Sequence, residues 1–408
     1  MKTLIILKGL AKQEKRKWVE REGLLDFFLD IDIIRKLYSN PELITPFKGI
    51  LSKSFGDTVY SEFMKILIIK LSKGGLVVLD PEEESLKTLE NLALIFGYTV
   101  FYVVQGIPQD YMTKPKLYSL PYYPQKKKDE LKRDVVNFMN LEFTDKNVIS
   151  RYKEVETYWE KKCKGENYFK IGKKSKPVLH ISDIHSNYSM YKSLPSSNKY
   201  SLRVFHGDYI DGPEEGGSRK MIDEVLWGES IPGTIWLEGN HELRLRKQLG
   251  ITMLSAGGKN REVRDLLKKS LPEDYTKTTF REFSNIPPDQ AREYLVKLNE
   301  VLKLFAIIET GKIIYICTHS GLKYVEQISP KYIGSVIYGN RDMNRMDREF
   351  SVHTKNTNYW SIHAHCKYYG DWMTHKYRNV VNLDPQSNEE IIFAEQDKNN
   401  WKTCQIGK

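Results

Sequence analysis

Short apolar runs alternate with polar sequence along the whole chain. In the first 145 residues, TLIIL (3–7), LVVLD (76–80) and VFYVV (100–104) have the length of buried strands, and residues 59–75 have helical spacing that ends in Gly-Gly. Strands that are separated by helices usually form a parallel sheet. We therefore predict an α/β domain with a parallel sheet over residues 1–145.

A second series of apolar runs begins at Lys176 and consists of PVLHIS, LRVFHG, TIWLEG, KIIYICTHSG and VVNLD. Each of the first four runs ends in a polar cluster, as expected where strand ends carry a functional site. Residues from about 218 to 303 are charged and have helical spacing. This pattern predicts a second domain over residues 177–408 with a helical insertion at about 218–303.

The stretch KKCKGENYFKIGKKSK (161–176), which precedes the second series, has seven lysines in sixteen residues. Such a charge run favours a solvated basic linker, which we place at residues 146–176. A contact with a phosphate backbone is the alternative interpretation of the same lysines.

The composition limits the possible function classes. The chain has 408 residues, enough for two domains, and 63 Lys and Arg against 53 Asp and Glu give a net charge of +10, which favours an anionic partner such as nucleic acid. The four cysteines, at 163, 317, 366 and 404, lie far apart, so neither a disulfide framework nor a cysteine zinc site is indicated. The apolar run at the N-terminus is too short for a signal peptide, and no run is long enough to span a membrane. We expect a cytoplasmic protein that makes no membrane contact.

Five polar clusters follow apolar runs in the second domain: SDIHSN (182–187), HGDYIDG (206–212), EGNHE (238–242), CTHSG (317–321) and SIHAHC (361–366). Together they offer carboxylates, an amide and imidazoles, and these oxygen and nitrogen donors suit Mn²⁺, Fe, Ni²⁺ or Zn²⁺. Asp183 and His185 are two residues apart, so an extended segment would turn both side chains to one side. A lone Asp–His pair is more often a surface hydrogen bond, but five clusters in order indicate one shared metal site.

The series D-x-H, G-D-x-x-D, G-N-H-E, a lone His after a strand and H-x-H resembles the calcineurin-like metallophosphoesterase superfamily over about residues 177 to 395. The resemblance implies an α/β domain with four layers in the order α/β/β/α. It also implies a site for two divalent metal ions, of which Mn²⁺ is the expected metal and Fe, Ni and Zn are alternatives. By resemblance the first ion is bound by Asp183, His185 and His365, the second by Asn240, His319 and His363, and Asp208 bridges both.

The chemistry of phosphoester hydrolysis fits this ligand set. Two ions need one shared carboxylate, and neutral ligands such as Asn240 leave positive charge for the phosphoryl group. A hydroxide held between the ions would attack phosphorus in line, without a covalent enzyme intermediate. On an extended segment His241 would point away from the ion that Asn240 binds and could protonate the leaving oxygen. Asp211 is its expected orienting partner, and Glu242 is expected to support the site from behind.

The first domain begins with LIILKGLAKQEKRKW, which resembles a strand followed by a phosphate-binding loop, with Lys15 at the place of the loop lysine. Glu14 stands where the second glycine is expected, and Arg16 stands where a Ser or Thr is expected. The order of segments resembles the P-loop kinase domain of polynucleotide kinase-phosphatases, so we predict a degenerate kinase-like domain. An active kinase and an unrelated α/β module are the alternatives. The candidates for nucleotide binding are Lys15, Asp32 and Arg35.

The substrate is left open by one departure from the family pattern. Gly212 stands where the protein Ser/Thr phosphatase branch usually carries an arginine that grips phosphate. The remaining candidates for this phosphate clamp are Arg219, Arg244, Arg246 and Arg341. Our leading hypothesis is a phosphatase that acts on nucleic-acid or nucleotide ends, with RNA or DNA ends as partners. A protein Ser/Thr phosphatase and a non-catalytic nucleic-acid-binding module are the alternatives, and the oligomeric state is left open.

Overall fold

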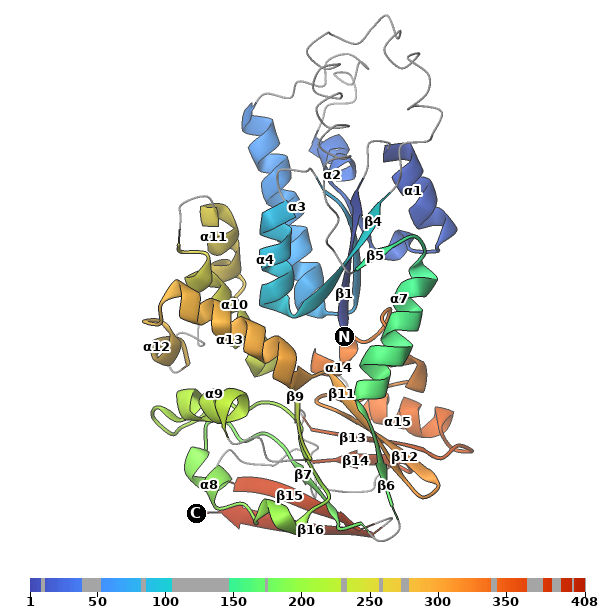
Figure 1. Cartoon of the computed structure of the whole chain (residues 1–408), viewed down its shortest axis with the longest axis vertical. Helices are drawn as coiled ribbons and strands as arrows, with labels where there is room; N and C mark the ends of the chain where they lie inside the picture. Colours follow the sequence, from blue (N-terminus) through green and yellow to red (C-terminus); the bar gives the residue numbers. More distant parts are fainter. Residues whose placement is uncertain are drawn as a thin grey trace, which may run out of the picture.

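The protein is described by a computed structural model that covers residues 1–8, 12–38, 53–81, 86–104, 147–172, 175–228, 233–256, 260–272, 279–338, 343–364, 377–383, 390–397 and 400–407. The strands in these residues form three sheets, and helices cover their faces (Figure 1). The α/β fold class that the sequence predicts is therefore confirmed. Within the described residues, no helix is long and apolar enough to cross a membrane.

The N-terminal sheet is parallel throughout, with the strand order β2-β3-β1-β4-β5. Its strands are β1 (Lys2–Lys8), β2 (Phe28–Asp30), β3 (Leu76–Asp80), β4 (Tyr98–Val104) and β5 (Val148–Ile149). The helices between them are α1 (Lys12–Arg21), η1 (Leu25–Phe27), α2 (Ile31–Tyr38), α3 (Lys53–Lys73) and α4 (Leu86–Phe96). Leu4 and Ile6 pack on the side of α3 and α4, whereas Ile5 and Leu7 pack on the side of α1. Burial on both faces explains why β1 is an unbroken apolar run.

The segment expected to be a solvated linker is folded, which differs from the expectation for residues 147–172. After β5 it forms α7 (Tyr152–Tyr158), the π-helical turn η5 (Trp159–Lys164) and β6 (Tyr168–Ile171), and β6 pairs with β11 (Phe305–Thr310). Trp159 is fully buried and stacks on Phe305. The lysine content misled because Lys161 and Lys162 are exposed on the helical segment, whereas Val155 and Trp159 on its other side pack in the cores of two different sheets.

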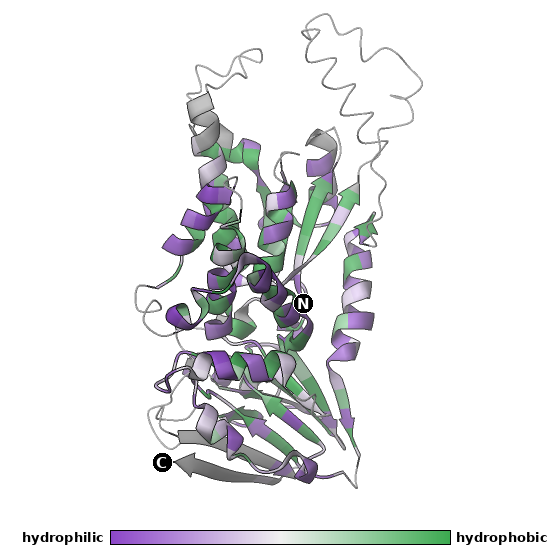
Figure 2. Ribbon diagram, turned by 60° about the vertical axis from the view of Figure 1, so that its left-hand side comes forward, coloured by the Kyte–Doolittle hydropathy of each residue, from purple (hydrophilic) through white to green (hydrophobic). Residues whose placement is uncertain are grey.

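The remaining strands form two further sheets. The six-stranded sheet has the order β10-β9-β8-β7-β15-β16, and the five-stranded sheet has the order β14-β13-β12-β11-β6. Their bounds are β7 (Val178–Ile181), β8 (Leu202–Phe205), β9 (Thr234–Leu237), β10 (Leu302–Lys303), β12 (Ile313–Thr318), β13 (Tyr359–His363), β14 (Val380–Asn382), β15 (Glu390–Asp397) and β16 (Asn400–Gly407). In the strands of these two sheets that Figure 2 draws in colour, hydrophobic residues predominate. Val204 and Leu237 of one sheet pack with Ile308 and Cys317 of the other.

Helices lie on the outer face of each of these two sheets, as the four-layer prediction requires. On the six-stranded sheet these include α8 (Tyr188–Lys192) and α9 (Gly217–Trp227), and the short η6 (Ser197–Lys199) follows α8 in the chain. Over the five-stranded sheet lie η9 (Val325–Gln327), α14 (Ser335–Tyr338) and α15 (Met343–His353). The layers place the ends of β7, β8, β9, β12 and β13 where their following loops can meet.

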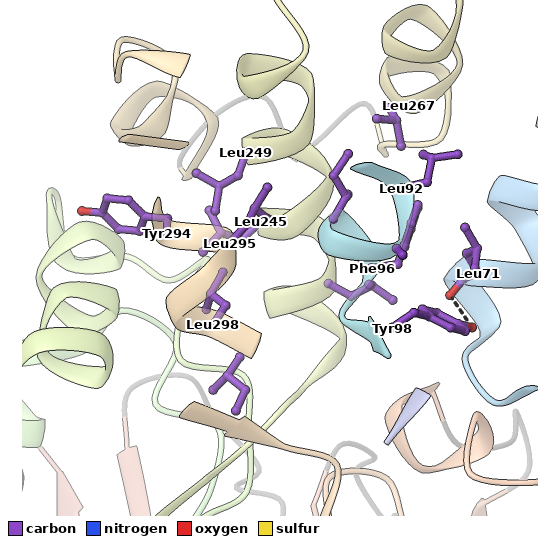
Figure 3. Close-up of a cluster of buried hydrophobic side chains, with 14 of the residues drawn as sticks. Leu71, Leu92, Phe96, Tyr98, Leu245, Leu249, Leu267, Tyr294, Leu295 and Leu298 are labelled. Atoms are coloured by element: carbon purple, nitrogen blue, oxygen red, sulfur yellow. Dashed lines mark hydrogen bonds between the residues drawn. The ribbon is translucent and has the colours of Figure 1, made fainter. Parts of the chain in front are cut away.

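The predicted helical insertion bridges the two halves of the molecule. It contains most of α9, α10 (Asn240–Met253), α11 (Arg261–Lys269), α12 (Thr279–Phe283) and α13 (Pro288–Val301), and it also contains β9 and β10, the last two strands at one edge of the six-stranded sheet. Leu92 and Phe96 of α4 share one hydrophobic cluster with Leu245, Leu249 and Leu298 of α10 and α13 (Figure 3). The N-terminal unit and the unit after it therefore share a core, and the division into two domains stays a prediction.

A buried ion-pair network lies at the junction of the two units. Lys2 Nζ of β1 is 3.0 Å from Glu238 Oε2 and donates to the carbonyl oxygen of Phe96 at 2.9 Å. Arg246 of α10 also donates to Glu238 and to Asn299 of α13. Burial lowers the pKa of Lys2 to about 8, although Glu238 opposes this shift. Glu238 lies two residues before Asn240, so the network joins the N-terminal sheet to a predicted metal ligand.

Replacing Lys2 by methionine tests how strongly this network holds the two units together. Lys2→Met keeps the apolar stem but leaves Glu238 with one cation, and breaking a buried pair from one side is costly. We expect the free energy of unfolding in urea to fall by roughly 3–5 kcal/mol. The exposed Lys161 provides the matched control, and Lys161→Met should change the midpoint little. Equal midpoints for the two variants would contradict a stabilising role of the junction.

Candidate active site

The loops after β7 and β8 have an unusual backbone conformation. Six described residues other than glycine have positive φ, and five of them lie in these loops: Asp183 (48°), His185 (45°), Ser186 (60°), Asp208 (55°) and Asp211 (64°). Each such residue costs about 1–3 kcal/mol, and such strain is concentrated at functional sites. The extended geometry assumed for Asp183 and His185 is therefore wrong. A left-handed turn instead brings His185 Nε2 to 3.7 Å from Asp183 Oδ1.

Glu242 holds the loop after β8 and ties it to the residue that precedes α10. Its carboxylate accepts the backbone N–H groups of Asp208 at 2.9 Å, Tyr209 at 2.8 Å and Gly239 at 2.9 Å. Burial, followed by the charge of Asp208, raises the pKa of Glu242 to about 8, and the hydrogen bonds oppose this by favouring the ionised form. Gly239 has to be glycine, because a Cβ there would collide with Asp208. The supporting role predicted for Glu242 thus has a direct geometric basis.

Asp183, His185 and Asp208 form the first group of possible metal ligands. One ligand atom from each of them lies within 4.8 Å of the others. Two carboxylates and an imidazole suit a divalent ion of the Mn²⁺ to Zn²⁺ series. Burial lowers the pKa of His185, which favours the neutral imidazole that binds metals.

A second group lies on the other side of Asp208. His319 Nε2 is 3.1 Å from Asn240 Oδ1 and 3.5 Å from Asp208 Oδ2. His319 Nδ1 donates to the carbonyl oxygen of His206 at 2.6 Å, which fixes the tautomer and turns Nε2 toward Asn240. Burial also lowers the pKa of His319. Because Asp208 contacts both groups, the residues present fit a pair of metal ions that share one carboxylate.

Of the two histidines in the cluster SIHAHC (361–366), the structure describes only His363. His365 lies outside the described residues. His363 is buried at the end of β13, where its Nε2 lies 3.0 Å from Asp347 Oδ1 of α15 and its Nδ1 lies 3.0 Å from the carbonyl oxygen of Ala364. Asp347 is itself buried, and no motif in the sequence marks it. Both ring nitrogens of His363 thus face protein oxygens, and the assignment of His363 as a metal ligand stays a prediction.

His241 is beside both groups and paired with Asp211. Its Nδ1 donates to Asp211 Oδ2 at 2.7 Å, and its Nε2 is 3.8 Å from Asp208 Oδ2. Burial alone would lower the pKa of His241, but Asp208 and Asp211 outweigh burial and raise it. Asn240 and His241 are in the first turn of α10, not on an extended segment, and they diverge because successive side chains on a helix point in different directions. A histidine with a raised pKa suits proton donation.

The structure separates the four candidate arginines. Arg246 is buried against Glu238, and Arg219 pairs with Asp223, while Arg341 lies outside the described residues. Arg244 is half-buried on α10, three residues after His241, and its positive charge acts to lower the pKa of His241. In the described part of the chain, Arg244 is therefore the candidate that lies near the site and is not engaged by a carboxylate.

The candidate nucleotide-binding residues lie in the N-terminal sheet. Lys15 Nζ of α1 donates to Asp80 Oδ1 at the end of β3 at 2.6 Å, and both side chains are buried. Asp32 is in the first turn of α2, where its N–H donates to Asp30 Oδ1 at 2.9 Å. The side chain of Arg35 lies outside the described residues. Nucleotide binding by these residues stays a prediction.

Two ligand groups that share Asp208, with a histidine–aspartate pair beside them, define the class of metal-dependent phosphoester hydrolases. The model of the calcineurin-like phosphoesterase family matches residues 176–399, which is more than half of the chain. The chain belongs to this family and is a metal-dependent phosphoester hydrolase that uses divalent metal ions. The resemblance found in the sequence is confirmed.

Two solved structures resemble large parts of the chain. One is described provisionally as a diadenosine tetraphosphatase; it has a TM-score of 0.35 and 15% identity, and the match covers 59% of this chain and 97% of that one. The other is a protein serine/threonine phosphatase from Saccharomyces cerevisiae with similarity to human phosphatase PP5; it has a TM-score of 0.36 and 10% identity, and the match covers 74% and 96% of the two chains. No curated protein matches the chain.

The packing of the loops after β7 and β8 leaves no room for a side chain at Gly212. A Cβ built on Gly212 would overlap the backbone carbonyl of His185, and a backbone atom cannot move aside as a side chain can. His185 N–H donates to the carbonyl oxygen of Asp208 at 3.0 Å, so the two loops are tied at this point. The departure from the protein phosphatase pattern at residue 212 is therefore built into this site.

Gly212→Ala should consequently damage both stability and catalysis. We expect a loss of about 1–3 kcal/mol in the free energy of unfolding, because the loops must separate to admit the methyl group. Phosphate release should fall at least tenfold, since His185 and Asp211 flank the displaced backbone. Gly165→Ala is the control, because a Cβ at Gly165 meets nothing within 4 Å. Wild-type activity in Gly212→Ala would contradict the close approach of the two loops.

Proposed function

We propose that the protein is a binuclear metal-dependent phosphatase that hydrolyses phosphoesters at nucleic-acid or nucleotide ends. The observation that carries the catalytic part is the position of Asp208, whose carboxylate contacts the Asp183–His185 group, His319 and His241. The ligands would be Asp183, His185 and His365 for one ion, Asn240, His319 and His363 for the other, and Asp208 for both. The ions, when bound, lower the pKa of water and offset the charge that develops on phosphorus.

His241 would act as the general acid. The bond from Nδ1–H to Asp211 leaves Nε2 as the nitrogen that delivers a proton to the departing oxygen. Asp211 and Asp208 together favour the protonated imidazole, as the raised pKa of His241 indicates. Attack by water on the phosphorus, with the proton of His241 passing to the leaving group, requires no nucleophile from the protein.

Three features favour a nucleic-acid or nucleotide substrate over a phosphoprotein. The chain has a net charge of +10, which attracts polyanions. The backbone at Gly212 has no room for the arginine that protein phosphatases use as a clamp. The N-terminal α/β unit shares a hydrophobic core with the catalytic unit, so a polymer held by the first would be at a fixed distance from the second.

We also propose that the N-terminal unit is a degenerate P-loop kinase-like domain. Its parallel sheet and the buried pair of Lys15 and Asp80 after neighbouring strands support this assignment. The role that we assign to it is to hold a polymer or nucleotide while the phosphatase site acts on the phosphate.

Replacing His241 by alanine tests the acid. His241→Ala should keep two Mn²⁺ per chain, because His241 is not among the proposed ligands, but should lower kcat on a 3′-phosphorylated oligonucleotide by about 10²–10⁴-fold. His353→Ala removes an exposed histidine of α15 and should leave the rate unchanged. Metal content by elemental analysis shows whether a slow variant has lost the acid or has lost its metal ions. A His241→Ala enzyme with full metal and full rate would refute the assignment.

The substrate class is tested by phosphate release from four compounds with Mn²⁺-loaded wild-type protein. The compounds are a 3′-phosphorylated oligonucleotide, an oligonucleotide with a 2′,3′-cyclic phosphate, a phosphopeptide and p-nitrophenyl phosphate. We expect the highest kcat/KM for an oligonucleotide end, because the basic stretch over residues 146–176, with ten Lys and Arg against four Glu, adds binding energy that small esters cannot use. A preference for the phosphopeptide would overturn the substrate assignment but not the hydrolase.

Arg244 is our candidate for the phosphate clamp. Arg244→Ala should raise KM for every phosphomonoester by about tenfold, which corresponds to one lost charge-assisted contact. Arg244→Lys should recover part of this loss, since it keeps the charge but not the paired hydrogen bonds of a guanidinium. The control is Arg261→Ala, which removes an exposed arginine of α11. An unchanged KM in Arg244→Ala would assign the clamp to another residue.

A further inference from the structure

Asp211 is held at both oxygens of its carboxylate. Oδ2 accepts from His241 at 2.7 Å, and Oδ1 accepts the hydroxyl proton of Thr279. Thr279 is the first residue of α12, in the helical insertion, and has no exposed surface. A segment far along the chain therefore completes the surroundings of the histidine–aspartate pair, and nothing in the sequence around Thr279 indicates this.

Three buried hydroxyl groups extend from this contact in one direction. Thr279 Oγ1 is 3.1 Å from Ser218 Oγ, and Ser218 Oγ is 2.6 Å from Ser186 Oγ. An ionised carboxylate only accepts hydrogen bonds, so Thr279 donates its single proton to Asp211 and has to accept the proton of Ser218. Ser218 in turn accepts from Ser186. Every hydroxyl in the chain therefore donates toward Asp211.

The same hydroxyls hold the backbone of the loop. The N–H of Asp211 donates to Ser218 Oγ at 3.2 Å, and the N–H of Gly212 donates to Ser186 Oγ at 3.1 Å. Asp211 has φ = 64°, a conformation that its surroundings have to maintain. Both the side chain and the main chain of Asp211 are thus fixed by hydroxyl groups.

We propose that Thr279 is a positioning residue for catalysis: by holding Oδ1 of Asp211 it fixes the rotation of the carboxylate and keeps Nε2 of His241 directed at the leaving oxygen. The inference rests on the proposed role of His241 as the acid. It gives the helical insertion a second task, because α10 and α13 join the two units while α12 contributes to the active site. Thr279 does not touch the substrate and acts only through Asp211.

The dependence on the leaving group distinguishes this role from general support of the fold. A sugar hydroxyl is a poor leaving group and needs a well-placed acid, whereas p-nitrophenolate leaves without protonation. Thr279→Val removes the hydroxyl and keeps the shape of the side chain. We expect kcat to fall by about 10–100-fold on a 3′-phosphorylated oligonucleotide and by less than about threefold on p-nitrophenyl phosphate, with KM nearly unchanged. Thr279→Ser, which keeps the hydroxyl, should restore most of the loss.

A double-mutant cycle with His241→Ala separates failure of this inference from failure of the proposed function. If Thr279 acts through His241, then Thr279→Val should have little further effect in the His241→Ala background. If His241→Ala itself slows both substrates equally, the acid is wrongly assigned. If His241→Ala shows the leaving-group dependence and Thr279→Val does not, only the role of Thr279 is refuted.

The remaining outcome is a structural role. Equal losses on both substrates in Thr279→Val, together with reduced Mn²⁺ content or a lower melting temperature, would overturn the proposal. Should Thr279→Val fail to fold, Ser218→Ala provides a second test, because it removes the hydroxyl that donates to Thr279. Ser218→Ala should produce a smaller loss with the same dependence on the leaving group, and a loss that is equal for both substrates would count against the chain of hydroxyls.

Discussion

The carboxylate of Glu242 is the element on which the active site depends most. It accepts three backbone N–H groups from the loop after β8 and from the start of α10, in surroundings without exposure to water. The loop after β8 that it holds contains Asp208 and Asp211 in the left-handed conformation, which is strained in residues other than glycine. Hydrogen bonds to a buried carboxylate are strong because water does not compete for them. Glu242 thereby offsets the strain that turns Asp208 and Asp211 toward the metal site and His241.

The site is also supported from the N-terminal unit. Glu238 lies just before the glycine that begins α10, and it is held by Lys2 of β1 and by Arg246 of α10 itself. Leu92 and Phe96 of α4 add apolar contacts to the same helix. A displacement of the N-terminal sheet would therefore act on the first turn of α10, where Asn240 and His241 stand. The contact between the two halves of the chain therefore lies beside the proposed catalytic residues.

The sequence predicts the parts of this architecture that have a local signature. Apolar runs with polar ends identify the strands and the clusters around Asp183, Asp208 and Asn240, because burial and metal chemistry both restrict residue type. Backbone conformation had no such signature, and the extended geometry assumed at Asp183 is a left-handed turn. Thr279 and Asp347 were not predictable, since they reach the site only through the packing of distant helices. The folded segment around Trp159 was missed because lysines dominate the composition of its exposed side.

The same arrangement couples metal binding to folding. Asp183, Asp208 and Glu242 are buried close together. Of the imidazoles beside Asp208, burial lowers the pKa of His185 and His319 and favours their neutral form, whereas the pKa of His241 is raised. Buried carboxylates at short range repel one another, and here strained backbone conformations hold them close together. Divalent ions held by these residues would supply positive charge and would bind only the folded arrangement, so their binding free energy would add to the stability of the loops. The strained backbone lowers the stability of the loops when no metal is bound, and on the proposed ligand set metal binding would restore stability as well as provide the chemistry.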